Sequence, residues 1–455
     1  MRLRLLAPLA LAGAALFGCD RALTTTPGDR VPADQIIVDA ATATAALNGA
    51  YDALQSGSYY GLDVEMLGDL PADNGQWAGT YQFLGEIAGN RITADNPEIT
   101  AMWTAIYKQI DRDNVVLQRV PQLTNVADAA KNPIIGEAYL LRALSYHNLV
   151  KFWGDVPMPL VPVVSASDAS AYTRTPQLQV YTQILADLDK AATLITNASD
   201  TRRANKLAVT ALRSRVLFYR AGLAGNANSA ADYQGALDAA NTVFATMKDT
   251  LTVPFGSLFT ATGANTAEDI FRVSFTASES NSLGYYWLNA GRHEARPTAN
   301  LRAAYDATDL RLPFTVGPRS STSSTLEGKK WPTTVGAEHP HVIRLAELVL
   351  IKAEVLARQN NLPGAVAEYN KVRARAGLVN HVLGVDVLTQ ADVMAAILKE
   401  RRRELALEGD RWPDLVRLGM AATVKAFTDR PGQALFPIPF RDISTTPGLT
   451  QNPGY

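Results

Sequence analysis

The chain has a single cysteine, Cys19, so no disulfide can form within it. Its few histidines stand apart from any evident partner ligands, which argues against a transition-metal centre. Its 43 basic and 44 acidic side chains nearly balance, so the basic excess expected of a nucleic-acid-binding protein is missing. No nucleophile elbow, phosphate-binding glycine loop or dinucleotide fingerprint occurs. These absences exclude most enzyme classes that are recognised by a short motif.

Long hydrophobic runs are also missing, with one short exception at the N-terminus. Residues 5–17 are apolar and follow Arg2 and Arg4, but they fall short of the roughly 20 residues that span a bilayer. A basic start with a short apolar run predicts a secretory signal peptide over residues 1–18. The run ends Leu-Phe-Gly-Cys, which resembles the bacterial lipobox. We therefore expect lipid on Cys19, a tether over residues 19–39, and a protein anchored to a membrane.

The remainder, residues 40–455, is predicted to form one mostly α-helical domain. Apolar side chains recur there at helical spacing in a series of segments. Residues 341–358 and 364–375 form an αα-hairpin of about the length of a tetratricopeptide unit, roughly 34 residues. We therefore predict a scaffold of tetratricopeptide-like helix pairs with long irregular loops and a few short strands. The predicted helices cover residues 40–55, 99–119, 132–153, 180–195, 204–221, 232–247, 341–358, 364–375 and about 391–408.

Two long blocks, residues 56–96 and 250–340, lack a sustained helical period, apart from a short strand predicted at 270–275. Long irregular loops on a rigid scaffold are where binding residues collect. Each block has aromatic side chains beside amides or acids, and such side chains can cover the apolar face of a sugar ring and bond its hydroxyls. The alternative is that the aromatics anchor the loops in small cores. The candidate ligand-binding residues are Asp73, Asn74, Gln76, Trp77 and Tyr81 in the first block, and Tyr285, Tyr286, Trp287 and Asn289 in the second.

The segment from Glu400 to Leu415 reads E-R-R-R-E-L-A-L-E-G-D-R-W-P-D-L. Arg401 and Glu404 lie three residues apart beside an apolar stripe, where an ion pair can form. Charges carried that far inward must be paired. We interpret the acids as structural and not as general acids, because no nucleophile or metal-ligand set lies beside them. The expected ion network comprises Arg401, Glu404, Glu408 and Arg411, with the helix ending at Gly409 and a tight turn at 412–415.

This segment resembles the C-terminal signature of the SusD/RagB family of bacterial outer-membrane nutrient-binding lipoproteins. Further segments match the family in order: G-E-A-Y-L-L-R-A-L-S-Y-H-N-L-V-K-F-W-G-D-V-P at 136–157, the helix pair within 343–378, F-P-I-P at 436–439, and the ending Q-N-P-G-Y. The resemblance implies an outer-membrane lipoprotein that faces the cell exterior. It also implies that the protein is no enzyme, binds oligosaccharides and passes them to a SusC-like TonB-dependent transporter.

Other functions stay open on the sequence. The ligand could be a peptide, as in the RagB branch of the family. A secreted glycoside hydrolase needs only two carboxylates, which leave no motif. A pure interaction scaffold would use the helix pairs and no small-molecule pocket. No cofactor is expected, although a structural calcium ion held by loop oxygens would leave no trace in the sequence.

Overall fold

The computed structural model describes residues 36–260 and 264–455. The predicted signal peptide, Cys19 and most of the predicted tether lie outside the described residues. Within the described part of the chain, no helix is both long enough and apolar enough to cross a membrane. The first described long helix, α3 (Ala40–Leu54), begins where the sequence predicts it, after the N-cap residue Asp39, whose side chain accepts a hydrogen bond from the Thr42 N–H.

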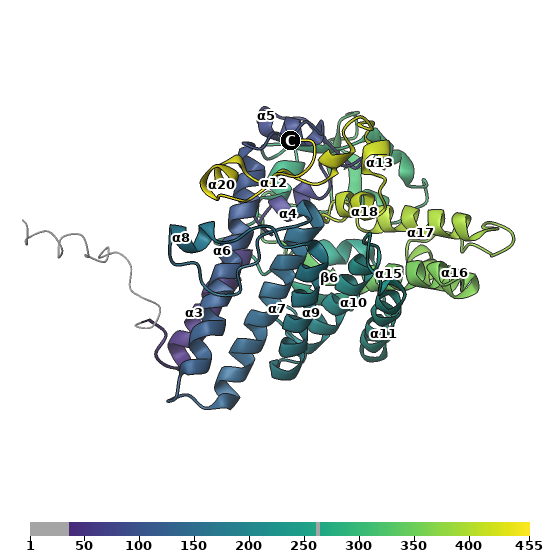
Figure 1. Cartoon of the computed structure of the whole chain (residues 1–455). Helices are drawn as coiled ribbons and strands as arrows, with labels where there is room; N and C mark the ends of the chain where they lie inside the picture. The colour runs from purple at the N-terminus through teal and green to yellow at the C-terminus, as the bar shows by residue number, and fades with distance from the viewer. Residues whose placement is uncertain (1–35, 261–263) are drawn as a thin grey trace, which may run out of the picture.

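Long antiparallel helices form the scaffold and lie side by side in Figure 1. Neighbours along the chain pack on one another: α6 on α7, α7 on α9, α10 on α11, and α15 on α16. This arrangement confirms the predicted helix-pair architecture. The long helices after α3 are α6 (Pro97–Arg119), α7 (Asp128–Trp153), α9 (Gln177–Leu194), α10 (Lys206–Ala221), α11 (Ser229–Met247), α15 (Leu345–Arg358), α16 (Leu362–Arg375) and α17 (Gln390–Glu404).

Several short helices, among them α5, α12, α13 and α20, gather at the upper end of the scaffold in Figure 1. The strands of the described residues form three two-stranded antiparallel sheets, β1–β3, β2–β6 and β4–β5. They are β1 (Gly75–Trp77), β2 (Asp269–Arg272), β3 (Ala295–Pro297), β4 (Val316–Pro318), β5 (Leu326–Gly328) and β6 (His341–Arg344). The short helices are α4 (Asp63–Leu67), α5 (Gln82–Ala88), η1 (Val120–Gln122), α8 (Ala166–Ser170), η2 (Phe255–Phe259), α12 (Leu283–Trp287), α13 (Ala299–Ala304), α14 (Leu312–Thr315), α18 (Arg411–Arg417), α19 (Ala421–Val424), η3 (Pro431–Ala434) and α20 (Phe440–Thr445).

Several predicted boundaries are wrong, each for a local reason. Helix α7 starts at Asp128, so Pro133 lies inside its N-terminal turns and does not open the helix. Residues 341–344 are extended and pair with β2, because long-range strand pairing overrides the helical period there. Helix α17 ends at Glu404, and residues 411–417 form α18 instead of a turn. Gly409 lies beyond the helix end; it has φ +80° and a Cβ there would lie 2.5 Å from the Val64 carbonyl oxygen.

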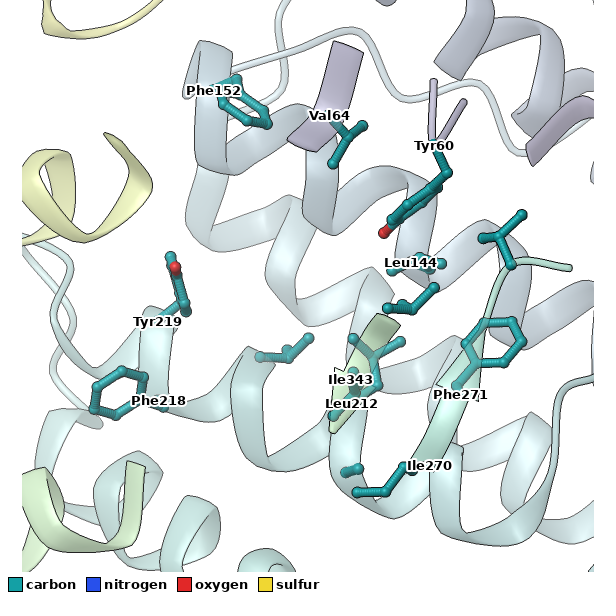
Figure 2. Close-up of a cluster of buried hydrophobic side chains, with 14 of the residues drawn as sticks. Tyr60, Val64, Leu144, Phe152, Leu212, Phe218, Tyr219, Ile270, Phe271 and Ile343 are labelled. Atoms are coloured by element: carbon teal, nitrogen blue, oxygen red, sulfur yellow. The ribbon is translucent and has the colours of Figure 1, made fainter. Parts of the chain in front are cut away.

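The core lies where the helices meet the β2–β6 pair. Figure 2 shows Phe271 and Ile343 from the paired strands close to Leu212 of α10 and Leu144 of α7. All four side chains are buried. Burial of a large aliphatic or aromatic side chain stabilises the folded state by about 1.5–3 kcal/mol relative to exposure. This contact fixes the irregular block that contains β2 and β6 to the helical scaffold.

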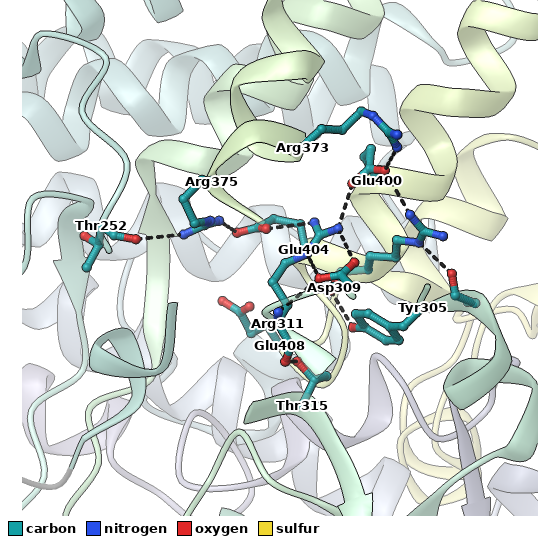
Figure 3. Close-up of polar contacts among 12 residues, drawn as sticks. Thr252, Tyr305, Asp309, Arg311, Thr315, Arg373, Arg375, Glu400, Glu404 and Glu408 are labelled. Atoms are coloured by element: carbon teal, nitrogen blue, oxygen red, sulfur yellow. Dashed lines mark hydrogen bonds and ion pairs between the residues drawn. The ribbon is translucent and has the colours of Figure 1, made fainter. Parts of the chain in front are cut away.

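A buried network of arginines and carboxylates joins α17 to the same irregular block (Figure 3). Glu404 accepts hydrogen bonds from Arg344 at 2.6 Å and Arg311 at 3.2 Å, and also from Arg375. Glu408 pairs with Arg344 at 2.8 Å. These partners come from α16, from β6 and from the segment before α14, so one helix end is tied to three separate parts of the chain.

The pairing differs from the one expected from sequence. Arg401 does not pair with Glu404, three residues away; its Nε lies 2.9 Å from Asp414 Oδ2 on α18. Arg411 pairs with Asp73 at 2.7 Å, far from Glu404. Local spacing identified the charged residues but not their partners, because the partners come from distant segments that converge on the helix end.

We predict that Glu404→Gln destabilises the protein strongly. Burial acts to raise the pKa of Glu404, but Arg375, Arg344 and Arg311 outweigh it and hold that pKa well below its ordinary value. Removing the charge leaves buried guanidinium groups without their counter-ion, which should cost about 3–5 kcal/mol in the free energy of unfolding. Urea unfolding at pH 7 measures this, with exposed Glu279→Gln as the matched control. Equal losses of unfolding free energy in the two variants would contradict the role of Glu404 as the counter-ion of the buried arginines.

Candidate functional site

The two irregular blocks that carry the candidate binding residues meet through a strand pair. Strand β1 pairs with β3 in the register Gly75–Pro297, Gln76–Arg296 and Trp77–Ala295. The Gln76 side chain reinforces the pair by donating to the Pro297 carbonyl at 3.2 Å, across 221 residues of sequence. The structure therefore brings together two clusters that the sequence could only identify separately.

Glu294, just before β3, organises the junction. Its buried carboxylate accepts a hydrogen bond from Trp77 Nε1 at 3.3 Å and one from the Tyr81 N–H at 2.9 Å. Arg292 Nε donates to the same carboxylate at 2.7 Å. Burial acts to raise the pKa of Glu294, but the hydrogen bonds from Tyr81 and Arg292 outweigh it and lower that pKa. A carboxylate whose ionised form is favoured thus fixes residues from both blocks.

Around this junction lies a surface that we call the aromatic platform: Trp77, Tyr81, Tyr285, Tyr286 and Arg292. Trp77 is 39 % exposed and Tyr285 is 45 % exposed. The Arg292 guanidinium lies 5.3 Å from the ring centroid of Tyr81 and 5.9 Å from that of Tyr286, so it bridges the two blocks by cation–π contacts. Trp77 and Tyr285 are therefore open to solvent, whereas Tyr81 and Tyr286 are half-buried beneath Arg292.

The rings are held in place by their neighbours and not by each other alone. A Cβ at Gly85 would lie 2.9 Å from the Trp77 ring, so α5 packs closely against that ring. The Tyr285 ring lies 6.1 Å from the Tyr286 ring at an interplanar angle of 63°. Pre-organised rings lose little conformational freedom when a ligand stacks on them.

Three of the predicted site residues do not belong to the platform. Trp287 has no exposed surface and lies in the core. Helix α12 explains this, because Leu283 and Trp287 are four residues apart and face inward while Tyr285 faces out. Asn74 is buried, with its amide donating to Asp69 at 2.6 Å. The Asp73 carboxylate is engaged by Arg411.

The two remaining candidates lie at the edges of this region. Gln76 and Asn289 are half-buried. Gln76 serves the strand pair, and the Asn289 N–H donates to Glu327 at 2.7 Å. Sequence reasoning missed Arg292 and Glu294. Their signal was present, because they follow the Tyr-Tyr-Trp cluster within the same irregular block.

A buried acid lies below the platform. Asp63 of α4 is almost wholly buried and lies against the Glu98 carboxyl. Burial first, and the neighbouring Glu98 second, raise the pKa of Asp63 well above its ordinary value. Burial first, and these acids among lesser causes, also raise the pKa of Tyr286. Folding therefore favours the protonated form of Asp63.

Metal ligation has no evident place in the described residues. Within 36–260 and 264–455, no three or more His, Cys, Asp or Glu side chains are grouped so as to hold a metal ion. The carboxylate oxygens of Glu294, beside the platform, accept hydrogen bonds from Trp77, Tyr81 and Arg292 instead.

Two family models match the chain. One, described as "Starch-binding associating with outer membrane", matches residues 32–218, and the other, described as "SusD family", matches residues 299–429. Among curated proteins, the SusD-like protein P2 of Formosa agariphila is 27 % identical over 97 % of both chains.

Solved structures share the fold. A SusD homolog from Bacteroides thetaiotaomicron is similar with a TM-score of 0.82 at 20 % identity, over 94 % of this chain and 99 % of that one. Surface glycan-binding protein A from Bacteroides thetaiotaomicron, solved in complex with laminarihexaose, has a TM-score of 0.77 at 20 % identity, over 92 % of this chain and 100 % of that one.

We predict that Asp63→Asn changes how stability depends on pH. Because the folded pKa of Asp63 is raised, its stabilising contribution is full below the unfolded value and is lost as pH rises towards the folded value. The melting temperature of the variant relative to the wild type should therefore rise between pH 4 and pH 7. Thermal unfolding at a series of pH values measures this. The exposed Asp95→Asn serves as control, and a constant difference across the series would contradict the assignment.

Proposed function

Because the chain belongs to the SusD/RagB family, we propose that it binds oligosaccharides on the aromatic platform. The single observation that carries the proposal is that one strand junction carries two exposed rings from distant blocks. Glu294 accepts the Trp77 N–H, and two residues earlier the Arg292 N–H donates to the Tyr285 carbonyl at 2.8 Å. A sugar ring has an apolar C–H face and a rim of hydroxyls. Fixed aromatic rings cover such faces, and a few nearby polar groups orient the hydroxyls.

The platform offers ring faces more than free hydrogen-bonding ends. The Trp77 N–H is already bonded to Glu294, so the ring cannot turn to use it elsewhere. Arg292 is exposed and can donate to a ligand from the edge of the Tyr81 and Tyr286 rings. This combination supports a saccharide. An extended peptide ligand would need free backbone partners for its own N–H and C=O groups.

We propose that the protein acts as a binder, because the acids beside the platform are not arranged for hydrolysis. Glycosidases hold two carboxyl groups at least about 5 Å apart on either side of the scissile bond. Asp63 and Glu98 lie against each other, and Asp63 is almost wholly buried, so this pair cannot flank a substrate. Glu294 is ionised and fully engaged, which leaves it unsuited to donate a proton.

The bound saccharide would then pass to a SusC-like TonB-dependent transporter. A lipid on Cys19 would hold the protein on the outer face of the outer membrane, close to that transporter. Confinement of this kind raises the effective concentration of ligand at the pore without any new contact. The family model described as "Starch-binding associating with outer membrane" supports this location.

We expect Trp77→Ala and Tyr285→Ala each to weaken oligosaccharide binding at least tenfold, because a buried aromatic contact contributes above about 1.4 kcal/mol. Trp77→Phe keeps a ring face and should lose less. Isothermal titration measures this, with protein that lacks residues 1–19 and therefore the predicted lipid anchor. The ligands are neutral hexasaccharides, including laminarihexaose, and mixed oligopeptides. Phe314→Ala, at a 41 % exposed ring elsewhere, is the matched control. Binding of peptides alone, or sugar binding unchanged by Trp77→Ala, would overturn the proposal.

We expect Cys19→Ser to release the protein from the membrane fraction. The change removes the thiol that would carry lipid and keeps the size of the side chain. Incorporation of a labelled fatty acid into the wild type, and none into the variant, should accompany the release. The control is Ser56→Ala, which keeps Cys19. Membrane retention of Cys19→Ser without label would contradict lipid anchoring at this residue.

A further inference from the structure

A second hollow surface lies along helix α6, away from the aromatic platform. It consists of two adjoining cavities, which we call the α6 groove. The first, of about 500 Å³, lies between α6, the segment that contains Tyr172, and α20. The second, of about 600 Å³, lies between α6, Asp95 and Phe440. Helices α6, α8 and α20 lie near one another in the left part of Figure 1. Both cavities fall in the size range of small-molecule sites.

The two cavities meet at a common set of side chains. Thr104, Lys108 and Arg441 line both of them. All three are exposed, and the charged ends of Lys108 and Arg441 form no ion pair within the described residues. The two cavities therefore adjoin at these side chains, and a ligand that fills both halves must be a chain of at least two units.

The walls of the first cavity are rigid and present ring faces. Trp103 Nε1 donates to Asp442 at 2.6 Å, and the Tyr107 hydroxyl donates to the Pro157 carbonyl at 2.7 Å. Asp111 accepts the Val163 N–H at 2.9 Å. Because the polar ends of these rings are already bonded, the side that faces the cavity is apolar. Tyr172 and Leu449 complete this apolar lining.

The rim carries both signs of charge. Besides Lys108 and Arg441, the two cavities are lined by three acidic residues, Asp95, Asp111 and Asp442. This balance disfavours a strongly anionic ligand, and the charged rim disfavours an acyl chain, which would bury those charges without partners. The walls contributed by α6 and α20 are helical, so they offer no free strand edge to an extended peptide. Apolar faces with donors and acceptors at the rim suit an uncharged sugar.

We propose that the α6 groove is a second binding site, separate from the aromatic platform, for a neutral linear oligosaccharide. One sugar unit would stack in the half lined by Tyr107 and Tyr172, and the chain would cross Thr104 into the half lined by Phe440. Lys108 and Arg441 would donate to its hydroxyls at the crossing. The groove and the platform have no residue in common, so each site can be removed without the other.

The test is a substitution that blocks the place at Thr104 where the two cavities meet. Thr104→Trp places a large ring where the two cavities meet. Thr182→Trp is the matched control, since both threonines are exposed on helices and both hydroxyls donate to the carbonyl four residues earlier, at 2.7 Å and 2.9 Å. Both variants are made in the Trp77→Ala background, which removes one of the two exposed rings of the platform and so weakens its contribution to binding. Titration uses laminarihexaose, maltohexaose and cellohexaose, with trigalacturonic acid as the anionic probe.

The proposal predicts residual binding of at least one neutral hexasaccharide in the Trp77→Ala background. Thr104→Trp should weaken that binding at least fivefold, and Thr182→Trp should leave it unchanged. Equal effects of the two tryptophans, preference for trigalacturonic acid, or no residual binding would each overturn the groove site. A failure of the platform appears separately, as wild-type binding that Trp77→Ala does not change.

Discussion

The buried charges at the end of α17 are the constraint on which the architecture depends. Glu404 and Glu408 lie inside the protein, where an unpaired carboxylate is too costly to persist. Glu404 is stable only while Arg311, Arg344 and Arg375 reach it from three separate parts of the chain. Glu408 depends in the same way on Arg344 and Lys330. If one of these segments moved away, the buried charges that remain would lose a partner. This requirement makes the irregular blocks parts of the scaffold and not loose additions to it.

The same helix end reaches towards the candidate site. Arg402 on α17 donates to Asn74 at 2.8 Å, and Arg411 on α18 holds Asp73. Directly after these residues comes β1, whose last residue, Trp77, is on the platform. Hydrogen bonds to Glu294 then fix Trp77 and Tyr81 from the other side. Trp77 and Tyr81 are thus positioned by ion pairs and hydrogen bonds at one end and by a strand pair at the other. This is the rigid support that a weakly polar binding surface needs.

Sequence reasoning predicted the helices well because their signal is local. The apolar period of α3, α6 and α15 is readable within a few residues, as is the start of α16 at Asn361 and Pro363. Contacts between distant segments had no such signal. Nothing near Arg401 indicates Asp414 as its partner instead of Glu404, and nothing near Gly409 indicates that α4 packs against it.

The candidate site, like the fold, could be predicted from the sequence only where the signal is local. Both aromatic clusters were identified, but their meeting depends on the β1–β3 pairing, which no local pattern encodes. Trp287 was predicted to bind ligand, although its four-residue spacing from Leu283 places it on the buried side of α12. Glu294 was overlooked.

The central claim is that the helix pairs act as a scaffold and that the aromatic platform binds the oligosaccharide. The most direct measurement is the crystal structure of the soluble protein with a bound neutral hexasaccharide. The account predicts a sugar ring stacked on Trp77 or Tyr285, with the Glu294 hydrogen bonds unchanged. An occupied ligand elsewhere, with both of these rings bare, would contradict it.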